Sequence, residues 1–417
     1  HGMYFAVGNG QSGATSDFDI NLGQRPWVYG PPDGYQAATL AGCYERPTII
    51  RPDKKYFKAV AYTGNGSSTD GNKIETPFEP DLVWIKRRST TTSHMLYDSV
   101  RGFGVNKALI PNGTYEEGDT SGVSEAVHGF LDTVVGNGFT VKAGSSSGVY
   151  TNTNDSDYVA WCWKAGGNKG TWNVDGKDVS NYTNAGLNYG DTSVLNGCSI
   201  NTKAGFSIVK WTQDSGGASK NIAHGLSKAP SFVVMKHINN TSNWYVVHTA
   251  IENVGKIMYL NTNSDQDTSS DFGGAWPGET YTATQTTGVN GRQVIMYSWI
   301  NVKGVQWFGQ FEGNGDSDGV YVPLGFKPAM LWIKRVDSDS SWRIWDNVRD
   351  WNNYNPRKEI LYINDNYGSN TEAGNAIDFL EQGFKIRNGT ADINNGGGKY
   401  SYMAWAETPA FNLYSSS

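Results

Sequence analysis

The sequence contains very little cysteine and histidine, with 3 Cys and 6 His among 417 residues. Three cysteines are an odd number spread over a long chain, so they supply no disulfide framework. No pair of cysteines or histidines has the spacing of a zinc site, and we expect neither a metal nor a cofactor. No run of 18 apolar residues occurs, so we expect no insertion into a membrane. Stability must therefore come from hydrophobic cores.

Concentrated positive charge is also lacking. The 34 Lys and Arg are scattered along the chain and are outnumbered by 40 Asp and Glu, which gives a formal net charge of −6. Nucleic-acid-binding domains carry a basic patch or stripe, so we expect no nucleic-acid partner. Aromatic residues, in contrast, make up 13% of the chain. Disordered chains are poor in aromatic residues, so we expect this chain to fold. The 51 Gly, together with Asn, Asp and Ser, separate short apolar runs, which is typical of antiparallel strands. The sequence therefore predicts an all-β protein.

One pattern occurs three times. A proline, one further residue, four apolar residues and a lysine form the stretches 80–86 (PDLVWIK), 230–236 (PSFVVMK) and 328–334 (PAMLWIK). A second short apolar run ends 18 residues after each proline. A proline suits the first residue of a strand, because its missing N–H breaks no ladder hydrogen bond. The following apolar run has no polar alternation, which predicts a strand buried on both faces. Each copy therefore predicts the central hairpin of a β-sandwich.

The recurring positions extend beyond these stretches. Copies one and three close with the similar sequences 158–161 (YVAW) and 402–405 (YMAW), and the middle copy closes at 296–299 (MYSW). We expect packing roles for the residues that recur. They are Pro80, Trp84, Asp98, Trp161, Pro230, His248, Trp299, Pro328, Trp332, Asp346 and Trp405.

These repeats predict tandem antiparallel β-sandwich modules of the jelly-roll or concanavalin-like kind. The expected boundaries are 51–167, 204–303 and 304–417. Residues 168–203 are rich in Gly, Asn, Asp and Thr, and we expect a linker or an inserted hairpin there. Residues 1–50 are too short for an independent sandwich. We interpret them as the last strands of a module that begins outside the numbered chain.

Several of these motifs resemble sequences of bacteriophage structural proteins. The stretch 21–27 (NLGQRPW), followed by 31–35 (PPDGY), resembles the terminal segment of SPRY-like domains in such proteins. The repeats resemble modules that accompany this segment in marine and cyanobacterial phage proteins; copy three matches best, through 325–328 (GFKP) and 402–407 (YMAWAE). The resemblance implies a virion-associated protein, located in the virion or outside the cell, with concanavalin-like sandwiches strung in series in a tail or head fibre.

The sequence offers no catalytic pattern. No Gly-x-Ser-x-Gly elbow is present, and His248 takes the place of Asp98 and Asp346 in its copy, which favours a packing role. The pairs Asp98 with Arg101 and Asp346 with Arg349 suit structural ion pairs better than general acids. The acidic loops lack the full pattern of a calcium site. We therefore expect a protein that is not an enzyme.

Aromatic residues in polar surroundings are the candidates for ligand binding. Trp276, Tyr281, Trp351 and Tyr354 lie in Gly- and Asn-rich stretches and do not recur between copies. Tyr and Trp faces stack on sugars and anchor interfaces. We expect these four residues to be exposed to a glycan or to another subunit.

These observations predict a non-enzymatic phage structural protein, a fibre or filament subunit that self-associates, for example as a trimer, and binds a host-surface polysaccharide. Two alternatives remain open. One is a glycan depolymerase on a jelly-roll scaffold, since a glycosidase needs only two suitably spaced carboxylates. The other is a purely structural filament or decoration subunit whose sheet edges are completed by strand exchange.

Overall fold

The computed structural model describes residues 52–119, 124–213, 220–249, 256–268, 281–284, 291–350, 354–371 and 373–409. All of these ranges belong to one unit of the chain, Ile49–Ser417. Its described part is built almost entirely from antiparallel strands, which confirms the predicted all-β fold. No helix in these ranges is long and apolar enough to cross a bilayer.

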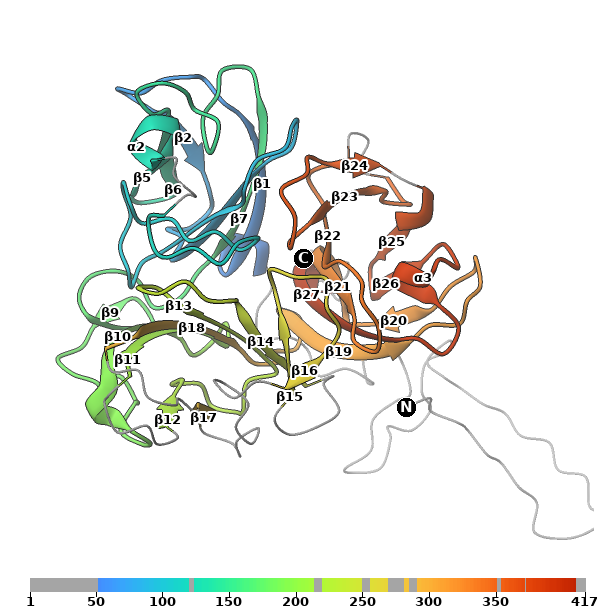
Figure 1. The fold of residues 1–417 in the computed structure, drawn as a ribbon. Helices are drawn as coiled ribbons and strands as arrows, with labels where there is room; N and C mark the ends of the chain where they lie inside the picture. Colours follow the sequence, from blue (N-terminus) through green and yellow to red (C-terminus); the bar gives the residue numbers. More distant parts are fainter. Residues whose placement is uncertain are drawn as a thin grey trace, which may run out of the picture. The chain divides into compact units, whose positions relative to one another are not determined.

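Module 1 consists of the first seven strands, drawn in blue to green in Figure 1. Its main sheet has the strand order β1-β7-β3-β4, and a smaller sheet of order β2-β6-β5 faces it. The helical turns η1 (Pro52–Lys54) and α2 (Glu125–His128) accompany them. The strands are β1 (Phe57–Thr63), β2 (Asn72–Glu75), β3 (Leu82–Arg87), β4 (Met95–Asp98), β5 (Phe130–Val134), β6 (Gly138–Lys142) and β7 (Asp157–Trp163).

Module 3 repeats this topology near the C-terminus. Its main sheet has the order β19-β27-β21-β22-β23-β24, and its smaller sheet the order β20-β26-β25. The turns η3 (Ala373–Asn375) and α3 (Ala391–Asn394) belong to it. The strands are β19 (Gln306–Glu312), β20 (Tyr321–Pro323), β21 (Phe326–Arg335), β22 (Arg343–Asp346), β23 (Glu359–Tyr362), β24 (Asn370–Thr371), β25 (Ile377–Leu380), β26 (Gly383–Ile386) and β27 (Lys399–Pro409).

Module 2 lies between them in the sequence and has the largest sheet, of order β16-β15-β14-β13-β18-β11-β10-β8-β9, with the pair β12-β17 beside it. The central strands β11, β18, β13 and β14 match β1, β7, β3 and β4 of module 1. Its elements are β8 (Trp172–Val174), β9 (Lys177–Asp178), η2 (Thr192–Val194), β10 (Leu195–Asn201), β11 (Phe206–Thr212), β12 (Lys220–Ala223), β13 (Phe232–His237), β14 (Tyr245–His248), β15 (Lys256–Tyr259), β16 (Asp267–Thr268), β17 (Tyr281–Thr284) and β18 (Gln293–Trp299).

Residues 168–203 therefore do not form a free linker. They supply the edge hairpin β8–β9 and strand β10, which pairs with β11 along its length and carries a bulge at Leu195/Gly197. Module 2 accordingly begins before the expected residue 204. Strand β10 also pairs in parallel with β8, so this edge is the one parallel contact among the described strands.

The three repeated strands β3, β13 and β21 are buried on both faces, and the two faces have different partners. In β3, Val83 and Ile85 pack into the core of module 1, between its two sheets. Leu82 and Trp84 point the other way, into a second core to which all three modules contribute. The equivalent residues of β13 and β21 divide in the same manner. Strands of this kind show no polar alternation because neither face meets water.

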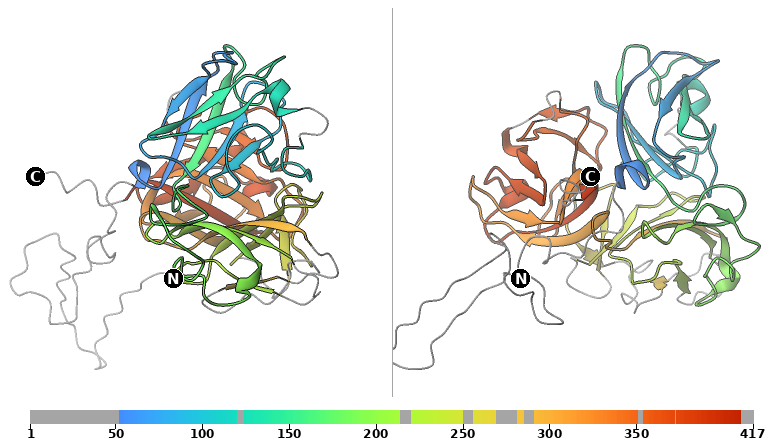
Figure 2. Two further views of the ribbon diagram at one scale, coloured as in Figure 1. Left: turned by 90° about the vertical axis from the view of Figure 1, so that its left-hand side faces the viewer. Right: turned by 180° about the vertical axis from the view of Figure 1, so that it is seen from behind.

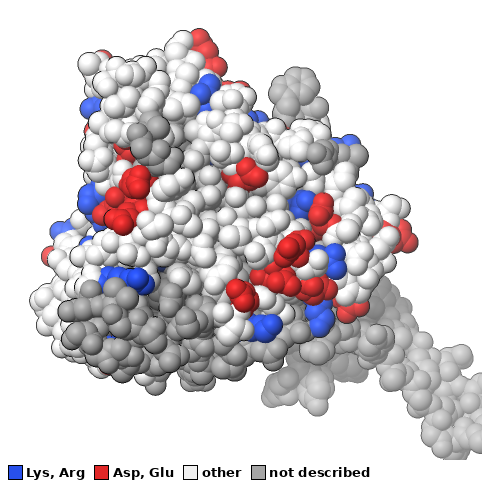
Figure 3. Space-filling model, viewed as in Figure 1, with Lys and Arg blue, Asp and Glu red and all other residues white. Residues whose placement is uncertain are grey.

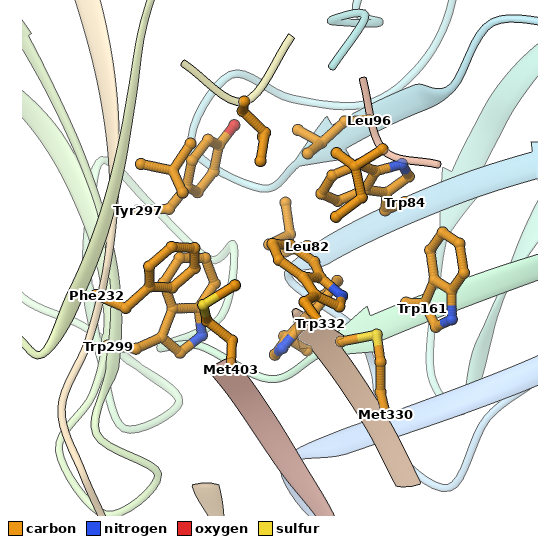
Figure 4. Close-up of a cluster of buried hydrophobic side chains, with 14 of the residues drawn as sticks. Leu82, Trp84, Leu96, Trp161, Phe232, Tyr297, Trp299, Met330, Trp332 and Met403 are labelled. Carbon is orange, nitrogen blue, oxygen red and sulfur yellow. The ribbon is translucent and has the colours of Figure 1, made fainter. Parts of the chain in front are cut away.

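The resemblance implied modules that follow one another in series. In the structure the three modules also pack against one another. Each places one face of its main sheet against the other two, and the side chains on these faces form one cluster, called here the shared core. Figures 1 and 2 show the three modules as separately coloured groups of strands, and Figure 4 shows shared-core side chains from the three modules pointing toward one another. Because these faces are buried against one another, the three modules are not separate domains along the chain.

Candidate functional site

The shared core contains one tryptophan from the last strand of each module at the same position. Trp163 pairs with Leu82, Trp299 with Phe232 and Trp405 with Met330 across neighbouring strands. The three indole rings contact each other pairwise, with centroid distances of 6.3 Å between Trp163 and Trp299, 5.6 Å between Trp163 and Trp405, and 6.1 Å between Trp299 and Trp405. Their planes are inclined by 60–77°, which is the edge-to-face geometry that aromatic pairs prefer. Each module is thus joined directly to both others.

A buried lysine stands next to the shared core in every module. The last residue of each repeated seven-residue stretch is this lysine, Lys86, Lys236 or Lys334. Each of the three has 0% exposed surface. Each ammonium group donates a hydrogen bond to the carbonyl of the residue that follows it, at 2.7–2.9 Å. Each also donates to a carbonyl of a neighbouring module: Lys86 to Asn366, Lys236 to Thr114 and Lys334 to Asn263, at 3.2–3.3 Å. The lysines therefore connect modules.

These three contacts follow one cyclic order. The hairpin of module 2 lies on a turn of module 1, the hairpin of module 3 on a turn of module 2, and the hairpin of module 1 on a turn of module 3. We call each such contact a joint and the accepting segments acceptor turns; they are residues 112–117, 261–266 and 364–369. Each acceptor turn begins with an asparagine whose side-chain oxygen accepts a backbone N–H, from residue His94, Trp244 or Trp342.

Main-chain hydrogen bonds complete each joint. The carbonyl that binds the lysine also accepts the backbone N–H of Thr92, Ser242 or Ser340, at 2.7–2.9 Å. In return, a backbone N–H of the acceptor turn donates to the hairpin: Ser369 to Arg88, Glu117 to Ile238 and Gln266 to Val336. Because donors and acceptors on both sides are backbone groups, the geometry survives wide variation in side-chain type.

A ring N–H makes the fourth contact, 14 residues after each repeat proline. Trp244 Nε1 donates to the carbonyl of Ile110 and Trp342 Nε1 to that of Tyr259, both at 2.9 Å. In module 1 the same position is His94, whose Nε2 lies 3.0 Å from the carbonyl of Tyr362. Trp84 Nε1 donates to His94 Nδ1, so Nε2 carries the hydrogen and donates. Burial holds the pKa of His94 well below its usual value, which keeps the ring neutral.

The residues 18 positions after each proline also reach across the modules. Asp98 forms a buried ion pair with Arg101. Its carboxylate also accepts a hydrogen bond of 2.6 Å from the hydroxyl group of Tyr297 in module 2. Asp346 forms the same ion pair with Arg349. Its carboxylate accepts a hydrogen bond of 2.9 Å from Nε1 of Trp161 in module 1. Buried carboxylates of this kind need partners for their charge and their lone pairs.

His248 replaces the carboxylate where no such donor exists. Trp161 and Tyr297 correspond to Met403 in module 3, because each lies opposite the same position of the repeated strand. A methionine has no N–H or O–H to donate. His248 instead places Nε2 3.2 Å from the backbone carbonyl of Tyr402, and burial lowers its pKa to about 4. The change from Asp to His thus matches the change on the facing module.

Burial also lowers the pKa of the joint lysines, to about 7 for Lys86 and Lys236 and about 8 for Lys334. An unfolded lysine keeps its proton to about pH 10. Between these values the folded chain binds fewer protons than the unfolded chain, so stability rises with pH. Above about pH 8.5 the thiols of Cys162 and Cys198 act in the opposite direction, because burial raises their pKa above the ordinary thiol value.

We therefore expect the urea concentration at half-unfolding to increase from pH 7 to pH 8.5. Lys236→Met removes one of the three groups and should reduce this slope, because methionine does not titrate. Lys228, which is exposed in the same module, supplies the control: Lys228→Met should keep the slope of the unchanged protein. A flat or falling profile over this window in the unchanged protein would contradict the lowered pKa of the three lysines buried in the joints.

The residues expected to bind a ligand are placed as follows. Tyr354 is 77% exposed and precedes Asn355, whose side chain binds the backbone N–H and carbonyl of Phe379. Tyr281 lies in β17, but its side chain is outside the described residues. Trp276 and Trp351 also lie outside them. Among the four, the structure therefore describes only the side chain of Tyr354.

The described residues include one contact of the kind found in catalytic sites and no cluster of metal ligands. No group of three His, Cys, Asp or Glu in these ranges gathers closely enough to hold a metal ion. Ser147 Oγ lies 2.6 Å from His128 Nδ1, the one described contact that resembles a nucleophile with its base. The backbone N–H groups of residues 144–147 around this serine all bind backbone carbonyls, so they leave no oxyanion site. We interpret the contact as structural.

Sequence reasoning identified the spacing of 18 residues but missed the joints. The lysine that ends each seven-residue stretch and the position 14 residues after each proline were both visible in the repeats. The second of these was hidden because His94 stands where Trp244 and Trp342 stand. The accepting carbonyls have no sequence signal, since any residue supplies one.

Comparison with known proteins gives one family. A family model described as a domain of unknown function (DUF7483) matches residues 52–409. This range begins at η1 and ends with β27, so it takes in all three modules. Among curated proteins, no sequence matches the chain. The matched range covers well over half of the sequence, and the chain therefore belongs to the DUF7483 family.

Proposed function

We propose that the chain is a non-enzymatic structural subunit of a bacteriophage particle, located in a fibre or filament outside the cell. The observation that carries the proposal is the use of the repeated polar residues. The joint lysines, Asp98, Asp346 and His248 are all buried and bonded between modules, so the pattern serves to hold three sandwiches as one block. A rigid block of this size suits a structural role.

The phage setting rests on the sequence resemblance of the repeats and of the segment 21–35. The surface is compatible with it: on the face drawn in Figure 3, Lys and Arg are dispersed and form no basic stripe, as expected for a partner other than nucleic acid. Exposed Tyr354 supports the adhesive part of the proposal, since tyrosine rings stack on sugars. A host-surface polysaccharide is the ligand we propose for this surface.

Two features favour association through module faces over strand exchange. Strand β11, which matches the edge strand β1 of module 1, is paired on its outer side with β10. The edge of β19 is capped by Asn301, whose side-chain oxygen accepts the N–H of Phe308 while its amide group donates to the Phe308 carbonyl. Capped edges do not accept a further strand.

Mass spectrometry and immunogold labelling of purified phage particles test this proposal. We expect the protein in stoichiometric amounts and gold on fibres or filaments. Particles that lack the protein should adsorb poorly to host cells if it is adhesive, and should lack the labelled structure in either case. Absence of the protein from particles, or release of reducing ends from polysaccharide by the purified chain, would contradict it.

A further inference from the structure

The three joints are copies of one interface, and this has a consequence for association between chains. Each module presents one hairpin and one acceptor turn, and each hairpin binds the acceptor turn of a different module. Such a contact is heterologous, because the two surfaces differ. Every module of a second copy presents the same two surfaces, so the interface does not distinguish a module of its own chain from one of another.

The connections between modules are unequal. Modules 2 and 3 are joined within residues 300–305, and the buried side chain of Gln306 donates to the carbonyls of Ala204, Gly205 and Ile300 across this connection. These bonds therefore hold modules 2 and 3 together at their connection. Modules 1 and 2 are connected by residues 164–171 (KAGGNKGT), with three glycines, among them Gly167 at φ +100°. In the closed chain the backbone N–H groups of Ala165 and Gly166 donate to the side chains of Asp81 and Ser199, so a second path of this segment breaks these two bonds. The glycines still give the backbone access to conformations that other residues avoid.

The joint between modules 3 and 1 differs from the other two in its connectivity. It joins the first and the last repeat, which are not neighbours in the chain. Its contacts include the Arg88–Glu359 ion pair at 2.8 Å, together with the bonds of Lys86, His94 and Thr92. If module 1 folds against modules 2 and 3 of another copy, all of these bonds form unchanged between chains.

We propose that module 1 is an exchangeable arm, and that a second copy of this chain is the partner that its hairpin and acceptor turn accept. Two chains that exchange arms form a closed dimer; chains that pass the arm onward form a head-to-tail polymer. The inference does not depend on the proposed place in a phage particle, because it uses only contacts already present within one chain.

The closed monomer is favoured at low concentration, because the connecting segment keeps module 1 at a high effective concentration next to its own partners. Exchange in the folded state would expose the faces that carry Trp163 and Trp84, so it proceeds through unfolding. Refolding at high protein concentration should therefore yield exchanged dimers, and refolding at low concentration should yield monomers. The dimers should persist after dilution, because the same buried contacts hold them.

Disulfide trapping tests the proposal in the full-length chain. In the joint between modules 3 and 1, Ser369 donates its backbone N–H to the carbonyl of Arg88, and Ser89 is the next residue after Arg88. In a Cys43→Ser background, one chain carries Ser89→Cys and a second carries Ser369→Cys. Co-refolding the two at high concentration should give a disulfide-linked heterodimer, whereas chains refolded separately and then mixed should not. The chain with both substitutions, refolded at low concentration, should form the link within itself.

A second measurement covers the case in which the cysteines do not react. The unchanged protein is refolded at concentrations that span a hundredfold range and is analysed, after dilution, by size-exclusion chromatography with light scattering. A dimer fraction that rises with refolding concentration supports exchange. Exclusively monomeric protein at every concentration, or an intrachain link without any interchain link in the mixture, would overturn the proposal.

Discussion

Replacing Trp405 by alanine is expected to lower the free energy of unfolding by about 3–5 kcal/mol, the range for a large aromatic removed from a core. Trp405 has no exposed surface, and its ring lies 5.1–6.1 Å from rings of all three modules. These rings belong to Phe57, Trp163, Trp299, Phe308 and Trp332. The cavity would open where the modules meet, so no single module can close it.

Chemical denaturation followed by circular dichroism measures this loss. Tyr354→Ala, an aromatic truncation in the same module at an exposed position, should change stability by no more than about 0.5 kcal/mol. Trp405→Phe keeps an aromatic ring and removes an indole N–H that has no partner among the described residues, so it should cost less than the alanine variant. A loss below about 1 kcal/mol for Trp405→Ala would show that the shared core contributes little.

The second large effect is expected at Asp346. The substitution Asp346→Ala leaves the guanidinium group of Arg349 buried without its carboxylate and removes the acceptor of Trp161 Nε1. Breaking a buried ion pair in this way costs about 3–5 kcal/mol, because the remaining charge stays uncompensated. Guanidinium or urea denaturation measures the difference.

Two comparisons separate the contribution across modules from that of the ion pair. Asp318→Ala removes an exposed carboxylate that contacts Lys385 and Arg387 and should leave stability nearly unchanged. Trp161→Phe removes the donor on module 1, together with part of the ring that lies 5.9 Å from the Arg349 guanidinium. Combined with Asp346→Ala, it should be non-additive, with a coupling of about 0.5–3 kcal/mol. Strict additivity would mean that the hydrogen bond between modules 1 and 3 contributes nothing.

The strands and their repetition could be predicted from the sequence because both depend on local pattern. The stretch 80–86 predicted a strand buried on both faces, and β3 indeed places Val83 in the module core and Trp84 in the shared core. The spacing of 18 residues predicted a hairpin, and β3 pairs with β4 up to Asp98. The strands thus followed from residue type and spacing alone.

The arrangement of the modules could not be predicted in the same way. An apolar face gives no indication of which other face covers it, and the joints depend on backbone carbonyls such as that of Asn366, which leave no mark in residue type. The ion pair of Asp346 with Arg349 was predicted, whereas its contact with Trp161 joins residues 185 positions apart. The binding residues were inferred from polar surroundings, and of these only Tyr354 has a described, exposed side chain.

Hydrogen exchange measured by mass spectrometry at increasing urea concentration tests whether the three modules share one core and unfold as a single unit. We expect peptides from β3, β13 and β21 to lose their protection together, at one urea concentration, in one cooperative step. Loss of protection in separate steps, with one module exchanging freely while the other two remain protected, would contradict it.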